Sequence, residues 1–262
     1  MSAILLEREI VHYEVLGRGR PVIFLHGWVG SWRYWIPVMQ SASMSFRAYA
    51  LDLWGFGDTS KNPQHYSLVE QVRLLETFLD QMGILRFALV GHGLGAILGM
   101  LFAYKNPAMV DRLMAVSCPL EESSIAHRLR TDSPVSLADW LLGKLPALEP
   151  ARVDTPKADP QAIQSSLASL STVRLREIYC SLQTPYLFVH GQADPAIQAP
   201  RMEQLAELPQ QAHALTFEQS GHFPMLDESS KFNRLLGDFL GLASGVSPRD
   251  LQLKEEWKRR VR

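Results

Sequence analysis

Apolar runs and alternating stretches divide most of the chain into predicted strands. Residues 9–15 alternate apolar and polar positions, as an antiparallel strand with one solvent-facing side does, and the glycine-containing stretch 17–21 predicts a turn after it. Short uninterrupted apolar runs are typical of strands that are covered on both faces. Such runs occur at 22–25, 48–53, 87–90, 113–117 and 186–189, and a further strand is expected at 212–218. The pattern predicts a buried, mostly parallel sheet.

Helical patterns separate most of these strands. Ser67 and the glutamate three residues later fit a capping box, which starts a helix that is expected to end at Gly83. A second helix is expected from just after Gly93 to just before Pro107, because proline lacks the amide that would continue it. Residues 229–242 form an amphipathic third helix. Strands that alternate with helices predict an α/β fold with right-handed crossovers.

One long segment, residues 119–184, contains no convincing strand. It holds several prolines and short helical patches at 136–145 and 159–178. A structureless loop of that length is uncommon inside a compact domain, so we expect a helical cap inserted between two core strands. The predicted organisation is a core of residues 1–118 and 185–246, a cap of residues 119–184, and a C-terminal tail or helix of residues 247–262.

Composition excludes several classes of protein. The formal net charge is -1, and charged residues make up 20% of the chain, so nothing favours a nucleic-acid partner. The N-terminal residues do not resemble a signal peptide, and no run approaches the ~20 apolar residues of a membrane span. We therefore expect a cytoplasmic protein that acts on a small molecule. Its oligomeric state stays open between monomer and homodimer.

Cysteine and histidine spacing gives no sign of a disulfide framework or a metal site. Cys118 and Cys180 are expected to be two buried thiols in a reducing compartment. The histidines are dispersed, and no helix carries an HExxH pattern. No metal and no cofactor is expected.

Candidate chemistry follows the predicted strands. HGW at 26–28, DLWGFGDTS at 52–60 and GHGLG at 91–95 each come after an apolar run. Asp194 lies in HGQADP and His222 in SGHFP, each after a later strand. Ligands of open α/β sheets bind beyond the carboxyl ends of the strands. These five segments are therefore expected to meet at one site.

The order and context of these motifs resemble an α/β-hydrolase over nearly the whole chain. That family uses the order nucleophile, acid, histidine, and its nucleophile lies in a G-x-S-x-G turn. Here the turn is Gly91-His92-Gly93-Leu94-Gly95, so Gly93 occupies the position of the serine. The turn strains its central residue by roughly 1 to 3 kcal/mol, a cost that glycine largely avoids.

The resemblance implies a role for each candidate residue. Asp194 would be the acid that orients His222, the general base, with Glu121 and Glu122 as alternative acids. The backbone amides of Trp28 and Leu94 would form the oxyanion hole. The implied ligand is a small apolar ester or other acyl compound. The residues expected to shape its pocket are His26, Gly27, Trp32, His92 and Phe223. His26 is expected to do so chiefly by bracing loops.

Three functional hypotheses follow from a glycine at the nucleophile position. The first is a serine hydrolase for carboxylic esters or related acyl compounds in which Gly93 replaces the nucleophile, as in a deliberately inactivated variant. The second is a natural, serine-independent enzyme in which His222 deprotonates water or a carbon acid. The third is a non-catalytic protein that binds a ligand in the capped pocket. Dehalogenase chemistry is excluded, because it needs an aspartate where Gly93 stands.

Overall fold

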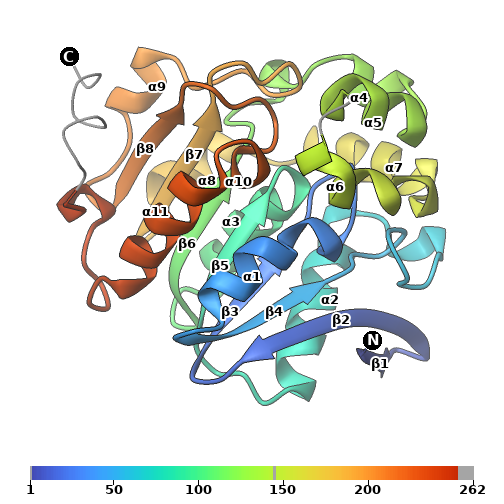
Figure 1. Ribbon diagram of the computed structural model, residues 1–262, viewed down its shortest axis with the longest axis horizontal. Helices are drawn as coiled ribbons and strands as arrows, with labels where there is room; N and C mark the ends of the chain where they lie inside the picture. Colours follow the sequence, from blue (N-terminus) through green and yellow to red (C-terminus); the bar gives the residue numbers. More distant parts are fainter. Residues whose placement is uncertain (1, 144–145, 253–262) are drawn as a thin grey trace.

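An eight-stranded sheet forms the centre of the protein (Figure 1). The computed structural model describes residues 2–143 and 146–252. The strand order is β1-β2-β4-β3-β5-β6-β7-β8; β1 pairs antiparallel with β2, β2 pairs antiparallel with β4, and all other neighbours are parallel. The strands are β1 (Ser2–Leu6), β2 (Glu9–Gly17), β3 (Arg20–Leu25), β4 (Phe46–Leu51), β5 (Phe87–His92), β6 (Val110–Val116), β7 (Tyr186–Gly191) and β8 (Ala212–Phe217).

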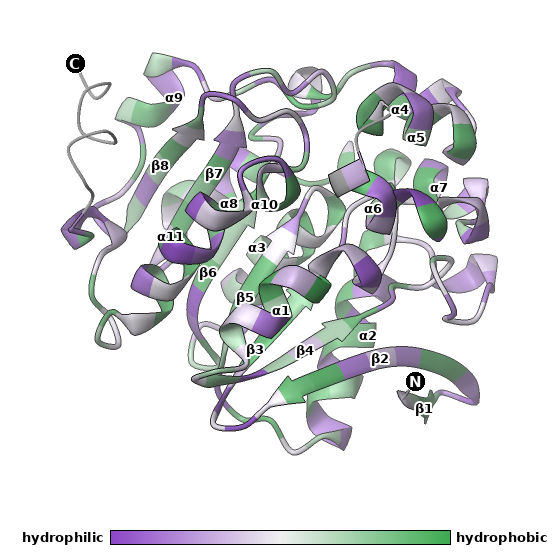
Figure 2. Ribbon diagram, viewed as in Figure 1, coloured by the Kyte–Doolittle hydropathy of each residue, from purple (hydrophilic) through white to green (hydrophobic). Residues whose placement is uncertain are grey.

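Helices cover both faces of this sheet (Figure 1). On one face, α1 (Ile36–Ala42) contacts α11 (Ser229–Gly241). On the other, α3 (Leu94–Lys105) contacts α2 (Leu68–Gln81) and α8 (Leu175–Ser181). Figure 2 shows apolar residues concentrated on the central strands, with hydrophilic residues on the outer side of α11. The predicted α/β-hydrolase fold, with its mostly parallel sheet, is confirmed.

Local sequence explains where the helices of the core begin and end. Ser67 caps α2 by accepting a hydrogen bond from the Glu70 amide, as the capping box predicts. The Glu70 carboxylate does not complete the box with a bond to the Ser67 amide; it lies against His65 and Arg73. Helix α3 starts directly after Gly93 and ends before Pro107.

The segment between β6 and β7 is helical, as expected, and its described residues contribute no strand to the sheet. The expected helix over 159–178 is two helices, broken at residues 171–174. Ser171 and Thr172 turn their hydroxyl groups onto carbonyl oxygens of the preceding turn, which ends α7. The elements of the segment are η3 (Glu122–Ser124), α4 (Arg128–Thr131), α5 (Pro134–Leu142), η4 (Pro146–Leu148), α6 (Glu149–Val153), η5 (Thr155–Lys157), α7 (Pro160–Leu170) and α8.

Three details of the fold differ from the sequence predictions or lie outside the structure. The edge strand β1 was not predicted. The prediction of two buried thiols is wrong for Cys180, which is exposed near the end of α8, whereas Cys118 is buried. Residues 248–250 of the expected tail form a short 3-10 turn, η6 (Pro248–Asp250), and residues 253–262 lie outside the described residues.

The remaining elements are η1 (Trp32–Trp35), η2 (Pro63–His65), α9 (Met202–Ala206) and α10 (Pro224–Asp227).

Candidate active site

The turn between β5 and α3 is sharp and holds three closely spaced glycines. Gly93 adopts φ 50° and ψ -109°, a left-handed conformation that strains other residues. A Cβ on Gly91 would lie 2.2 Å from the Gly95 carbonyl oxygen, and a Cβ on Gly95 would lie 2.4 Å from the Leu25 carbonyl oxygen. A Cβ on Gly93 would meet nothing closer than the Trp28 ring at 3.4 Å. The flanking glycines are required for space, whereas the central position has room for a Cβ.

His222 and Asp194 form a buried hydrogen-bonded pair. The His222 Nδ1–H donates to Asp194 Oδ2 at 2.9 Å, and each side chain is 1% exposed. The other carboxylate oxygen accepts from the amides of Ala196 and Ile197 at 2.8 and 3.0 Å. Burial alone would raise the pKa of Asp194, but the charge and hydrogen bond of His222 and the two amide bonds lower it below its usual value. Asp194 is therefore held ionised.

This pair lies against the glycine turn. His92 Nε2–H donates to the His222 carbonyl oxygen at 2.8 Å, and the two imidazole rings are 4.5 Å apart. The Phe223 ring packs against both histidines. Since Asp194 uses Nδ1, the remaining nitrogen of His222, Nε2, has no hydrogen-bond partner among the described residues. A neutral His222 thus keeps a lone pair on Nε2.

The loop after β3 forms another side of the site. The Gly95 amide donates to the His26 carbonyl oxygen at 3.0 Å, which fixes this loop beside the turn. Within residues 2–143 and 146–252, the Trp28 and Leu94 amides have no hydrogen-bond acceptor. Leu94 is the first residue of α3, where the helix dipole favours negative charge.

His26 braces this loop with both ring nitrogens. Nδ1–H donates to the Gly27 carbonyl oxygen at 2.8 Å, and Nε2 accepts from the Leu53 amide at 3.0 Å. Burial lowers the pKa of His26 and keeps it neutral, as these two bonds require. Neither nitrogen is left for a substrate.

The two alternative acids lie in other ion pairs. Glu121 pairs with Arg201 at 3.0 Å, and Glu122 pairs with Arg130 at 2.7 Å. The structure brings Asp194, and neither glutamate, to His222.

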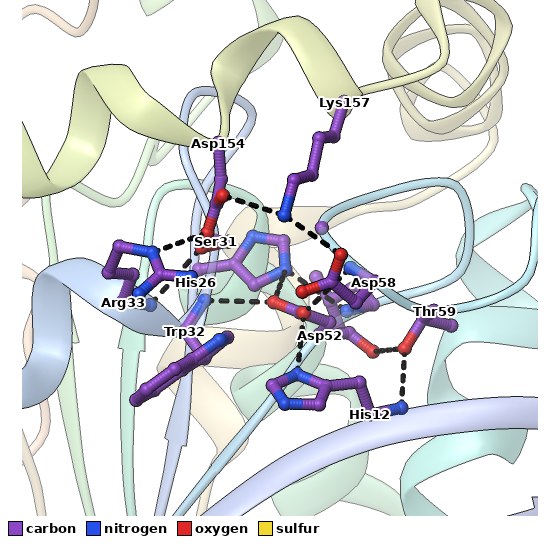
Figure 3. Close-up of polar contacts among 12 residues, drawn as sticks. His12, His26, Ser31, Trp32, Arg33, Asp52, Asp58, Thr59, Asp154 and Lys157 are labelled. Atoms are coloured by element: carbon purple, nitrogen blue, oxygen red, sulfur yellow. Dashed lines mark hydrogen bonds and ion pairs between the residues drawn. The ribbon is translucent and has the colours of Figure 1, made fainter. Parts of the chain in front are cut away.

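A second cluster surrounds Asp52 (Figure 3). Its carboxylate accepts from His12 Nδ1 at 2.9 Å, from the Trp32 amide at 2.9 Å and from the Asp58 amide at 3.0 Å. The Trp32 ring lies against His12, so the structure places this residue in the Asp52 cluster. His12, Asp52 and Asp58 present ligand atoms within 4.8 Å of one another, but the ammonium group of Lys157 already lies 2.8 Å from Asp58.

The Asp52 cluster continues into the helical segment. Asp154, which follows α6, accepts from Ser31 Oγ at 2.7 Å and Arg33 Nε at 2.8 Å (Figure 3). Lys157 bridges Asp154 and Asp58. The Trp28 indole N–H also donates to Ser166 on α7 at 3.0 Å. The helical segment is thus fastened to the loops that follow β3 and β4.

A cavity of about 280 Å³ lies elsewhere. Arg20, Phe87 and Arg112 line it, from the amino ends of β3, β5 and β6. His222 and Gly93 follow the carboxyl ends of strands, so this cavity is not the candidate site.

Comparison with protein families agrees with this geometry. The family model described as "Alpha/beta hydrolase family" matches residues 22–235, a span that includes the glycine turn, Asp194 and His222. The chain belongs to the alpha/beta hydrolase family. The resemblance seen in the sequence is thereby confirmed.

Relatives of this alpha/beta hydrolase are themselves hydrolases by name. The chain is 27% identical to a putative carbamate hydrolase RutD of Yersinia enterocolitica, over 94% of this chain and 97% of that protein. It is 24% identical to a pimeloyl-[acyl-carrier protein] methyl ester esterase of Vibrio cholerae, over 87% of this chain and 97% of that protein. These names support a hydrolase of esters or related acyl compounds at the level of the family.

Solved structures share the fold. An N-acyl homoserine lactonase, determined as a serine-to-glycine mutant with N-hexanoyl homoserine lactone, superposes with a TM-score of 0.80 at 18% identity, covering 91% of this chain and 96% of that one. A Thermogutta terrifontis esterase has a TM-score of 0.77 at 19% identity, with 91% and 97% covered. None of the described helices is long and apolar enough to cross a membrane.

Proposed function

We propose that this chain has the site of a carboxylic ester or lactone hydrolase in which glycine occupies the nucleophile position. The observation that carries the proposal is the conformation of Gly93, with φ 50° in a turn whose flanking glycines are required for space. This is the strained turn that holds a nucleophile at the end of a strand. A Cβ at Gly93 would lie 3.4 Å from the Trp28 ring, an ordinary van der Waals contact. The site therefore lacks the nucleophile, while the backbone that presents it is intact.

The neighbouring residues have roles that fit this chemistry. His222 is the general base, and Asp194 fixes its Nδ1–H tautomer and stabilises its cation. The unpartnered amides of Trp28 and Leu94 bind the carbonyl oxygen of the substrate as negative charge develops on it. The helical segment 119–184 acts as a cap that carries Ser166 onto Trp28.

Apolar walls and the comparisons favour a substrate with an apolar acyl group. The Trp28 ring lies beside Gly93, and the Phe223 ring lies beside His222. The relatives named as a methyl ester esterase and a carbamate hydrolase cleave acyl bonds by name. The lactonase that resembles this chain held its lactone in a serine-to-glycine form.

The test compares Gly93→Ser with Gly93→Ala on p-nitrophenyl butyrate. Both variants gain a Cβ in the strained turn, so each should lose roughly 1 to 3 kcal/mol of unfolding free energy. Only the serine variant gains a nucleophile, and its kcat should exceed that of the unchanged chain by on the order of 10⁴- to 10⁶-fold. Equal rates for the two variants, both folded by circular dichroism, would contradict the proposal.

A second candidate function rests on His222 itself. Its pairing with Asp194 is intact although no serine is present, and Nε2 has no hydrogen-bond partner in the described part of the chain. Such a base can deprotonate water directly, without a covalent intermediate. In that case the unchanged chain hydrolyses an ester at a measurable rate, and His222→Ala abolishes the activity. If the unchanged chain and His222→Ala are equally inactive, only binding of the acyl ligand remains.

A further inference from the structure

Four buried groups connect the loop that carries Trp28 to the loop that carries His222. The Gly27 amide lies 2.6 Å from the Tyr34 hydroxyl oxygen, and that oxygen lies 2.9 Å from His92 Nδ1. His92 Nε2 lies 2.8 Å from the His222 carbonyl oxygen. Tyr34 and His92 are both 0% exposed.

We infer that Tyr34 and His92 are positioning residues, which hold the Trp28 amide and His222 in a fixed relation through one directional chain of hydrogen bonds. The inference extends the proposed function, because it concerns the same base and the same oxyanion-binding loop. Neither residue contacts a reacting atom in this account.

Chemistry permits only one placement of protons along this chain. A carbonyl oxygen only accepts, so His92 Nε2 must carry its proton toward His222. A neutral imidazole has a single N–H, so His92 Nδ1 must accept, and the Tyr34 O–H donates to it. The Tyr34 oxygen then accepts from the Gly27 amide. Each bond fixes the direction of the next.

Burial keeps the two side chains of this arrangement neutral. Burial, followed by the charge of His222, holds the pKa of His92 well below its usual value. Burial holds the pKa of Tyr34 well above its usual value. Both groups therefore remain neutral through the pH range in which a histidine base acts.

A second donor acts on the same carbonyl group. Ser117 Oγ–H donates to the His222 carbonyl oxygen at 3.1 Å. Ser117 follows β6 with φ 44°, a left-handed conformation that is uncommon for a residue with a side chain. His92 ends β5, so the main chain of His222 is held from the ends of two neighbouring strands. Its side chain is held separately by Asp194.

The first experiment measures proton positions in the unchanged chain by ¹⁵N NMR of the histidine side chains. We expect His92 to carry its proton on Nε2, with no titration between about pH 5 and 9. A proton on His92 Nδ1, or titration of His92 in that range, overturns the inference. This measurement does not depend on activity, so it tests the inference independently of the proposed function.

The second experiment removes the Tyr34 oxygen. Tyr34→Phe keeps the ring that packs against Phe223 but leaves the Gly27 amide and His92 Nδ1 without partners. We expect backbone amide shifts to change at both Trp28 and His222. The matched control is Tyr186→Phe, which removes a buried hydroxyl from β7 that donates to the Tyr179 carbonyl oxygen. Changes confined to the surroundings of Tyr34 would show a local structural role and contradict the inference.

The third experiment reads catalysis in the Gly93→Ser background. A misplaced base and oxyanion donor should lower kcat by on the order of 10²-fold, with KM little changed, for Tyr34→Phe but not for Tyr186→Phe. His92→Gln can retain a donor near the Nε2 position, whereas His92→Asn cannot reach the His222 carbonyl group. We therefore expect Gln to preserve more activity than Asn. Equal kcat losses for the two tyrosine variants would contradict positioning.

Discussion

His222 and His12 each donate from Nδ1 to a buried aspartate at 2.9 Å, yet the two pairs have different surroundings. His222 lies beside the glycine turn, with its ring 4.5 Å from that of His92. His12 lies on β2, with its ring against Trp32 and its Nε2 3.5 Å from Glu14. A histidine–aspartate pair is therefore no sign of catalysis by itself. The two pairs differ in the surroundings of the second histidine nitrogen, Nε2.

The two aspartates, Asp194 and Asp52, also differ in the backbone amides that they bind. Asp194 accepts amides from its own loop, at Ala196 and Ile197, so it serves mainly to hold His222. Asp52 accepts one amide from its own loop, that of Asp58, and one from Trp32, the first residue of η1 after β3. Asp52 therefore joins loops, and His12 is one of several groups that it holds.

Electrostatics favours the protonated form of His12. Burial lowers the pKa of His12, but the hydrogen bond and charge of Asp52, with the charges of Glu14 and Asp58, outweigh it and raise the pKa. The cationic form of His12 is thus stabilised, which suits an anchor. A general base must be neutral to accept a proton.

The largest expected effect separates the two histidines directly. In the Gly93→Ser background, His222→Gln should lower kcat for p-nitrophenyl butyrate by on the order of 10⁴- to 10⁶-fold, because the nucleophile loses its base. His12→Gln should change kcat by less than about 10-fold, because His12 contacts neither the turn nor His222. Comparable losses of kcat for both variants would contradict the distinction between His222 and His12.

The next prediction concerns stability against pH. The folded pKa of His12 is raised, so its contribution is fully present below its unfolded pKa of about 6.5 and is lost as pH rises through the folded pKa. His12→Gln should therefore lose more unfolding free energy at pH 5.5 than at pH 8.5, measured by urea denaturation. The folded pKa of Asp194 is lowered, so its contribution is present above about 3.8 and is lost only as pH falls further.

The main features of the fold and of the histidine pair could be predicted from local patterns. Apolar runs locate the buried strands, and the spacing of Gly91, Gly93 and Gly95 marks a turn because two of these positions have no room for a Cβ. The motif order placed Asp194 and His222 after later strands. Their hydrogen bond is observed, while their catalytic roles remain proposals.

The remaining parts of the site depend on contacts that no local pattern encodes. Tyr34 was missed because its partner His92 lies 58 residues away, and nothing near Tyr34 marks it as polar rather than as another core aromatic. Asp154 was missed for the same reason, since Ser31 lies 123 residues from it. The sequence predicts Trp32 as a pocket residue, and the structure shows its ring packed against His12, a contact that no local pattern indicates.

The smallest expected effect tests the fastening of the helical segment to the core. The Lys157 side chain is 40% exposed, and its ammonium group bridges Asp154 to Asp58; Lys157→Met removes that bridge. In the Gly93→Ser background, KM should rise by about two- to five-fold at low salt, with the difference shrinking at high salt. Lys105→Met, which breaks the exposed pair with Glu76, is the control and should leave KM unchanged. An equal rise in KM in both variants would contradict the prediction that the Lys157 bridge affects substrate binding.

The most direct test of the central claim is covalent labelling of Gly93→Ser by a fluorophosphonate, followed by intact-mass measurement. We expect one adduct per chain on the new side chain, and much slower labelling when His222→Gln is added, because His222 activates the hydroxyl group. The unchanged chain should take up no adduct at this position. A folded Gly93→Ser protein that remains unlabelled would contradict the claim that Gly93 stands where the nucleophile of a hydrolase belongs.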